Sequence, residues 1–189
     1  MLKDIIKDKK KIHTRDISLS TYPLSKKEII VEGILIDKSY HKIFTIAGKV
    51  KEPGIIHHIA IRLLIKADPL TIIDSEAEML KVPVEECKTT LDTLSKIKGV
   101  EIKSGFSNLI RKTMGDKKGC AHLAHLVIVM GQEVVHGWFT HKRKTKSPVP
   151  ENIETFQGKE FILNSCRMWA KNGPRMKRLE HSFQKNNHD

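Results

Sequence analysis

The sequence is poor in aromatic residues and in cysteine, and these shortages restrict the class of protein it can encode. Only 5% of the 189 residues are aromatic, so the core must be built mainly from aliphatic side chains. Three widely spaced cysteines do not make a disulfide framework. No apolar run has the length of a membrane span, and the lysine-rich residues 1–11 lack the apolar segment of a signal peptide. These absences predict a cytoplasmic protein with reduced thiols and no membrane segment.

Familiar catalytic signatures are also missing. The sequence has no glycine-rich phosphate loop, no Ser/His/Asp signature and no Cys-x-x-Cys pair. No two carboxylates stand out as an acid and a base, because Asp74, Glu76 and Glu78 are typical of an exposed strand edge. Whether the chain is an enzyme therefore stays open, and a role without catalysis is favoured.

Positive charge is abundant, and one basic run lies between the apolar helix and the last part of the chain. Lysine and arginine number 34 against 22 acidic residues, a net charge of +12. Such an excess favours anionic partners, although it is equally typical of proteins from a lysine-rich organism. A basic run followed by Pro148 and Pro150 marks the best boundary in the chain. The residues of this run are candidate anion ligands: Lys142, Arg143, Lys144 and Lys146.

The pattern of apolar residues predicts strands first and helices afterwards. We expect strands at 29–36 and 43–47, joined by a turn at 37–40, and a second hairpin from 55–65 and 70–74. Helical spacing follows at 83–97, 105–114, from 119 onward and at 161–171. This order predicts an α+β fold, with an antiparallel sheet of two N-terminal β-hairpins and helices on one face.

Three parts are expected along the chain. Residues 1–25 form a basic N-terminal arm that could add an edge strand at 15–21, and 26–141 form the α+β core. Residues 142–189 form a basic linker and a helical tail, polar from Arg175 onward.

The stretch Gly119-Cys120-Ala121-His122-Leu123 is the most distinctive in the sequence. It places a thiol and an imidazole where a long apolar helix begins, and the positive end of a helix favours a thiolate. A thiolate is both a nucleophile and a metal ligand. The alternative is a small buried cysteine at a helix start with a packed histidine beside it. His57 likewise is either a ligand or a packed residue, because it begins the apolar face of the 55–65 strand.

Several of these motifs resemble an uncharacterised bacterial family, domain of unknown function 2889. The resemblance covers most of the chain, and chiefly residues 53–130. It rests on the Gly-x-Ile-His start of a strand at His57, Cys87 about thirty residues on, the Gly-Cys-x-His-Leu stretch, and the later residues 164–169. The family implies a domain and not an activity.

A more distant resemblance is to the U-type (NifU/IscU/SufU-like) iron–sulfur cluster scaffold proteins. Their three cysteines fall near His57, Cys87 and Cys120 in this sequence, which implies a NifU/IscU-like core and a shared metal site. The first ligand would be histidine, Ile59 replaces their aspartate, and His122 follows Cys120 instead of a histidine preceding it. The implied cofactor is zinc, iron or an iron–sulfur cluster, and the implied partner is a cysteine desulfurase-like donor or an apo-protein client.

Three functions follow, in this order of preference. The first is a metal-binding or iron–sulfur accessory protein that uses His57, Cys87 and Cys120, with His122 as fourth ligand or in support. The second is a binding module for an anionic partner through 142–146 and 175–178, with weak, sequence-independent nucleic-acid binding. The third is a thiol enzyme in which Cys120 is the nucleophile and His122 or His125 the base. Two further ligand candidates are His58 and Cys166.

Overall fold

The computed structural model describes residues 1–146 and 148–186, and the chain divides into two compact units. The first unit is Met1–Trp138 and the second is Phe139–Asp189. Among the described residues, no helix combines the length and the apolar character needed to cross a membrane. The candidate site lies entirely in the first unit.

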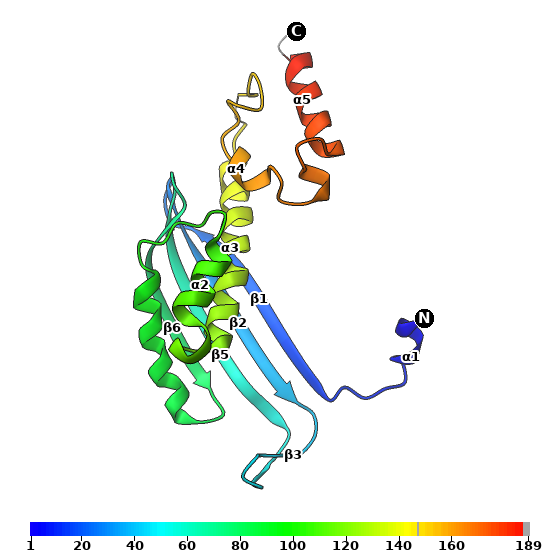
Figure 1. Ribbon diagram of the computed structural model, residues 1–189, viewed down its shortest axis with the longest axis vertical. Helices are drawn as coiled ribbons and strands as arrows, with labels where there is room; N and C mark the ends of the chain where they lie inside the picture. The colour runs from blue at the N-terminus through cyan, green and yellow to red at the C-terminus, as the bar shows by residue number, and fades with distance from the viewer. Residues whose placement is uncertain (147, 187–189) are drawn as a thin grey trace. The chain divides into compact units, whose positions relative to one another are not determined.

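A four-stranded antiparallel sheet forms the framework of the first unit, as Figure 1 shows. After a short helix, α1 (Leu2–Ile5), the chain forms β1 (His13–Pro23), β2 (Glu28–Ser39), β5 (Gly54–Lys66) and β6 (Thr71–Lys81), which lie side by side in that order. The antiparallel α+β fold is confirmed. The hairpin predicted from 55–65 and 70–74 is β5–β6, and the edge strand predicted at 15–21 lies within β1.

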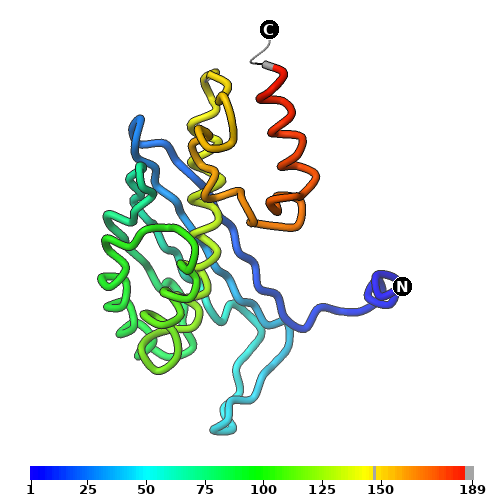
Figure 2. The backbone as a smooth tube through the Cα atoms, turned by 45° about the horizontal axis from the view of Figure 1, so that its top comes forward, coloured from blue at the N-terminus to red at the C-terminus, as the bar shows by residue number. Residues whose placement is uncertain are grey.

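The first predicted hairpin is wrong. Residues 29–36 do not pair with 43–47, because β2 continues through Asp37 to Ser39 and pairs with β1 on one side and β5 on the other. Residues Ile43–Phe44 form β3, which pairs with β4 (Val50–Lys51) in a small hairpin that projects beyond the sheet (Figure 2). The predicted turn at 37–40 assumed that Asp37 would not lie inside a strand. A carboxylate is stable there only when it is paired, and its partners come from the neighbouring strands.

Three helical segments cover one face of the sheet: η1 (Glu85–Ile97), α2 (Phe106–Met114) and α3 (Ala121–Lys142) (Figure 1). The odd-numbered residues of β2 and β5 point toward them, and Ile29, Leu35, Ile61 and Leu63 are fully buried. From α3 the apolar side chains Leu123, Leu126, Val127, Met130 and Val134 close this core. The predicted helices at 105–114 and from 119 onward are therefore confirmed.

The helix expected at 83–97 forms as a 3-10 helix. Its hydroxyl side chains favour the tighter winding, because each can donate a hydrogen bond to a nearby backbone carbonyl and so competes with regular helical bonding. Thr89, Thr90, Thr93 and Ser95 each donate to the carbonyl three residues earlier. A further 3-10 turn, η2 (Asp116–Lys118), links α2 to the start of α3.

In the second unit the predicted single helix at 161–171 is wrong. The chain instead forms α4 (Lys159–Ile162) and η3 (Arg167–Trp169), and then α5 (Pro174–Asn186), which includes the residues from Arg175 onward that were expected to be polar. Asn164 interrupts the helix with a left-handed backbone angle of 59°, and its side chain accepts a hydrogen bond from the Lys171 amide. Pro174 is the first residue of α5, a position where its missing N–H costs nothing.

Candidate functional site

The register of three strands places Arg15, Asp37 and His57 in one row across the sheet. Arg15 of β1 lies directly opposite Asp37 of β2, and Asp37 lies directly opposite His57 of β5. Residues opposite each other in an antiparallel pair share a face of the sheet. That face is the one covered by the helices. A β-bulge follows at once, because Lys38 pairs with Ile55 and leaves Ile56 without a partner residue.

Asp37 is the buried centre of this row, with only 2% of its surface exposed. Arg15 donates from Nε to Oδ1 and from Nη2 to Oδ2, each at 2.7 Å. These hydrogen bonds lower the pKa of the Asp37 carboxyl; burial acts in the opposite direction, while the charges of Arg15, His57 and His122 lower the pKa further. Asp37 is therefore an ionised carboxylate at neutral pH, able to accept hydrogen bonds or to bind a cation.

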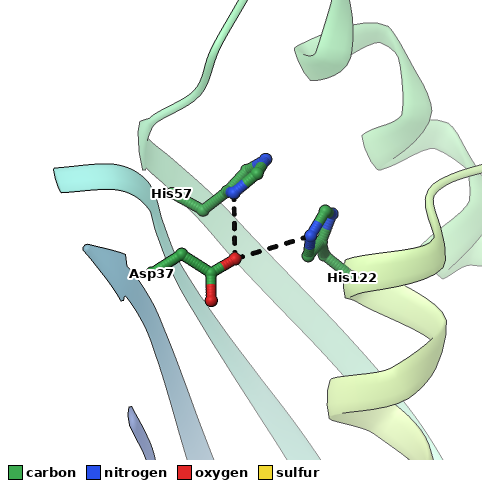
Figure 3. Close-up of side chains that lie close together, drawn as sticks. All are labelled: Asp37, His57 and His122. Atoms are coloured by element: carbon green, nitrogen blue, oxygen red, sulfur yellow. Dashed lines mark hydrogen bonds and ion pairs between the residues drawn. The ribbon is translucent and has the colours of Figure 1, made fainter. Parts of the chain in front are cut away.

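The third side chain of the site, His122, comes from the first turn of α3. Gly33 lets this helix lie close to β2, because a Cβ there would be 2.7 Å from Met130 Sδ and 3.1 Å from a methyl carbon of Leu126. Asp37 is two core-facing positions beyond Gly33 on β2, and His122 is one turn before Leu126 on α3. The start of the helix thus lies over the end of the strand, and the sheet and helix residues point toward one another (Figure 3).

Three possible metal-ligand atoms lie close together, one each from Asp37, His57 and His122. Oδ2 of Asp37 is 3.0 Å from His57 Nδ1 and 3.5 Å from His122 Nε2 (Figure 3). The two imidazole rings lie with centroids 4.0 Å apart. In the part of the chain that the structure describes, these three residues form the one group whose ligand atoms all lie within 4.8 Å of one another.

This spacing fits a bound metal ion. Ligands at about 2.0–2.1 Å in tetrahedral geometry are themselves about 3.4 Å apart. The two carboxylate–imidazole distances lie on either side of that value. His57 and His122 are 15% and 27% exposed, so the group lies just below the surface and solvent ions can reach it.

Cys120 adjoins the group through His122. Its Sγ is 3.8 Å from His122 Nδ1, the ring nitrogen that faces away from Asp37. Cys120 precedes α3, and its carbonyl accepts the first helical hydrogen bond, from the Ala124 amide. Burial tends to raise the pKa of the thiol, but hydrogen bonds from the His122 side chain and from the Leu123 and His122 amides outweigh burial, so the pKa lies below its ordinary value.

Gly119 is required by close packing and not by an unusual backbone angle. Its φ of −174° is extended and open to any residue. A Cβ at this position would be 2.5 Å from the Met114 carbonyl oxygen and 2.9 Å from Thr93 Cγ2. Gly119 thus lets the chain pass between α2 and η1 and fixes where Cys120 and His122 lie.

The structure brings some of the predicted site residues together and leaves others apart. His57 and His122 meet, and Cys120 is next to His122. Cys87 is half-buried near the start of η1 and is not part of the three-residue group. His58 pairs with Ile36 on the opposite face of the sheet. Cys166 is exposed in the second unit, where Lys142, Arg143, Lys144 and Lys146 are exposed as well.

Sequence reasoning missed Asp37 and Arg15. A signal for Asp37 is present in the alternation of β2, where Ile29, Val31 and Leu35 occupy the buried positions and Asp37 continues the same phase. A carboxylate in the buried phase of a strand requires a cationic partner or a metal. Arg15 has no comparable signal, because its role depends on the pairing of β1 with β2.

A family model matches residues 13–136, and its description is "Protein of unknown function (DUF2889)". The match contains every residue of the Asp37, His57 and His122 group, together with Arg15 and Cys120. The comparisons with curated proteins and with solved structures gave no match. They therefore do not support the resemblance to U-type iron–sulfur scaffold proteins.

Proposed function

We propose, for a chain that belongs to the DUF2889 family, that Asp37, His57 and His122 bind a divalent transition-metal ion. The observation that carries this proposal is the convergence of one carboxylate oxygen and two imidazole nitrogens, each within 4.8 Å of the others. The ligands come from β2, β5 and α3, so the folded sheet and helix hold them in place before any metal arrives.

The chemistry of the donors favours zinc or ferrous iron. Two imidazoles and one carboxylate form a borderline nitrogen and oxygen set that suits either ion. An iron–sulfur cluster is usually held by thiolates, and the three-residue group contains none. The proposed centre is therefore a single ion, and Cys120 supports it through His122.

Arg15 and Cys120 orient the two kinds of ligand. Arg15 fixes both oxygens of Asp37, and the Cys120 thiol lies against the nitrogen of His122 that does not face Asp37. Partners of this kind set the orientation of metal ligands and their donor strength. Three protein ligands leave at least one coordination position for water or a second molecule. The site is thus suited to binding or exchange and not only to structural support.

Zinc titration of the metal-free protein by calorimetry tests this proposal, with protein that carries no affinity tag. We expect one zinc ion per chain and at least about tenfold weaker binding in His57→Ala, His122→Ala and Asp37→Asn, because each substitution removes a ligand atom. Circular dichroism verifies that each variant is folded.

His58→Ala is the matched control. It removes the neighbouring imidazole, which lies on the opposite face of the same strand, so zinc affinity should stay at the wild-type value. Undiminished zinc binding by both His57→Ala and His122→Ala would show that the metal proposal is wrong.

A second candidate function rests on a different reading of the same contacts. His122 lies between a thiol and a carboxylate. Its Nδ1 is 3.8 Å from Cys120 Sγ, and its Nε2 is 3.5 Å from Asp37 Oδ2. A thiol, an imidazole base and an orienting carboxylate in this order are the parts of a nucleophilic cysteine site. In this function, the Cys120 thiolate attacks an acyl carbon, forms a thioester and expels the leaving group.

A p-nitrophenyl ester distinguishes the second candidate from the first. If it is right, metal-free protein releases a burst of nitrophenolate that is absent in Cys120→Ala and slower in His122→Ala and Asp37→Asn. A burst rate that does not depend on His122 and Asp37 would eliminate the nucleophilic site. In the metal proposal, by contrast, Cys120→Ala keeps its zinc, bound less tightly.

A further inference from the structure

Arg15 uses only part of its guanidinium to bind Asp37. Of its five N–H groups, one on Nε and one on Nη2 donate to the carboxylate. The other three bond to no acceptor within residues 1–146 and 148–186. The side chain is 41% exposed, so these donors are accessible to solvent while the guanidinium is held in one orientation.

These donors lie beside the proposed metal ligands. Arg15 Nη2, His57 Nδ1 and His122 Nε2 all surround the same oxygen, Oδ2 of Asp37. His13 extends the group along β1, with its Nε2 4.0 Å from Asp37 Oδ1 and its side chain 46% exposed. β1 is the edge strand of the sheet, so among the described residues no further strand adjoins this side of the site.

The charges of the site are unbalanced once a divalent ion is bound. The Asp37 carboxylate and the Arg15 guanidinium compensate each other, and the two histidine ligands are neutral when they bind a metal. The two charges of the ion then have no counterpart among these ligands. An anion in the open coordination position reduces this excess, and half-buried charges are screened less than exposed ones.

We propose that Arg15 and His13 form an anion subsite beside the metal, so that the molecule bound by this centre carries an oxyanion, either a carboxylate or a phosphate. One oxygen of the anion occupies the open coordination position, and another accepts hydrogen bonds from the remaining Arg15 donors. This inference rests on the proposed metal site. A fixed guanidinium is well suited to the role, because its planar fork matches two oxygens of the same anion.

Arg62 provides a contrast, because its surroundings are negatively charged. It lies in the same sheet on the opposite face, where it donates to Glu32, Glu76 and Glu78. Three carboxylates surround it, so an added anion would meet negative charge. Arg62 is therefore the matched control for Arg15: both are sheet arginines that bind carboxylates, but three carboxylates surround Arg62 and one binds Arg15.

Cobalt-loaded protein provides the test, because the visible absorption of protein-bound cobalt responds to a new ligand. Inorganic phosphate and acetate are titrated separately at saturating cobalt, so that the tighter of the two identifies the anionic group. We expect the affinity for that anion to fall about tenfold in Arg15→Lys, which keeps the charge and loses the fork, and further in Arg15→Gln. His13→Ala should weaken binding less, and Arg62→Gln should match the wild type.

The two proposals fail in different ways. If the wild-type protein does not bind cobalt, the metal site is wrong, and the anion subsite falls with it. If cobalt binds but neither probe changes its spectrum, or if the affinity is the same in the wild type, Arg15→Lys and His13→Ala, the anion subsite alone is wrong. His13→Ala decides the case if an Arg15 variant does not fold, because His13 is the more exposed and less bonded side chain.

Discussion

Arg15 and Asp37 are joined by two parallel hydrogen bonds of 2.7 Å between adjacent strands, and the carboxylate they hold is almost fully buried. The two residues lie on consecutive strands, and the pairing register of β1 and β2 places them opposite each other. A paired carboxylate of this kind both stabilises the fold and is held in one position.

Asp37→Asn should destabilise the protein in a way that depends on pH. The pKa of Asp37 is lower in the folded protein than its ordinary value of about 3.9. The unfolded chain therefore binds a proton more readily, and the stabilisation is complete above that value and is lost as the pH falls toward the folded pKa. Urea unfolding of wild type and variant should show a difference in free energy of unfolding that is constant near neutral pH and shrinks below about pH 4. A constant difference down to the lowest pH would show that the carboxylate charge contributes nothing.

Cys120 should react with iodoacetamide at lower pH than an ordinary thiol. Its pKa lies below the usual range, so the pH midpoint of the alkylation rate should fall below about 8.5. His122→Ala should raise this midpoint, because the largest lowering contribution comes from that side chain. Mass spectrometry of the labelled peptides separates Cys120 from Cys87 and Cys166. A midpoint that His122→Ala leaves unchanged would contradict the contact between the two side chains.

Gly119→Ala should disturb the site without altering any side chain in it. The added methyl carbon would lie 2.5 Å from a backbone oxygen, which cannot move aside as a flexible side chain can. We expect a loss of about 1–3 kcal/mol in unfolding free energy, as in other overpacked positions, and weaker zinc binding. Gly48→Ala is a control for adding a methyl group where nothing lies within 4 Å, although it carries its own cost from a positive backbone angle. Gly48→Ala should leave zinc affinity unchanged.

The contact between β2 and α3 can be measured by combining two substitutions. Gly33→Ala places a methyl carbon 2.7 Å from Met130 Sδ and should cost about 1–3 kcal/mol, while Met130→Ala should cost about 2–5 kcal/mol by leaving a cavity. In the double variant the new methyl group enters that cavity. Its total cost in urea unfolding should thus be less than the sum of the single costs. Simple additivity would mean that the two residues do not touch.

Nucleic-acid binding by the second unit should be weak and independent of sequence. Its basic run is exposed, but two of its aromatic rings already contact arginines of the same unit: Arg143 lies over Phe139 and Arg175 over Trp169. Neutralising Lys142, Arg143, Lys144 and Lys146 to glutamine should flatten the dependence of log affinity on log salt by up to about 0.9 per lost phosphate contact on duplex DNA. Sequence-selective binding that survives physiological salt would make the anionic-partner function the stronger one.

Local sequence patterns predicted the parts of this protein but not how they pair. Alternating and helical periodicity indicated β5, β6, α2 and α3, and it placed His57 on the apolar face and His122 at a helix start. These signals depend only on neighbouring residues. They were enough to identify two of the three ligands in the proposed site.

Asp37 continues the buried alternation of β2, but its partners Arg15 and His57 are 22 and 20 residues distant and no local pattern predicts them. An aspartate followed by Lys38 and Ser39 is typical of a turn, and only the pairing of three strands makes it a buried strand residue. Asn164 is a similar case in the second unit, where a single left-handed residue divides an apparently continuous helical pattern. At Asp37 contacts distant in sequence decided the local structure, and at Asn164 a single backbone angle did.

His122 faces two different neighbours with its two ring nitrogens: Nε2 toward Asp37 and Nδ1 toward Cys120. A neutral imidazole carries one proton, on either Nδ1 or Nε2, so one nitrogen donates a hydrogen bond and the other accepts one. A cation on Nε2 forces the proton onto Nδ1, where it points at the sulfur. A cation bound on the carboxylate side of the ring would thereby change the hydrogen bond that Cys120 receives, through a single side chain and without any movement of the backbone.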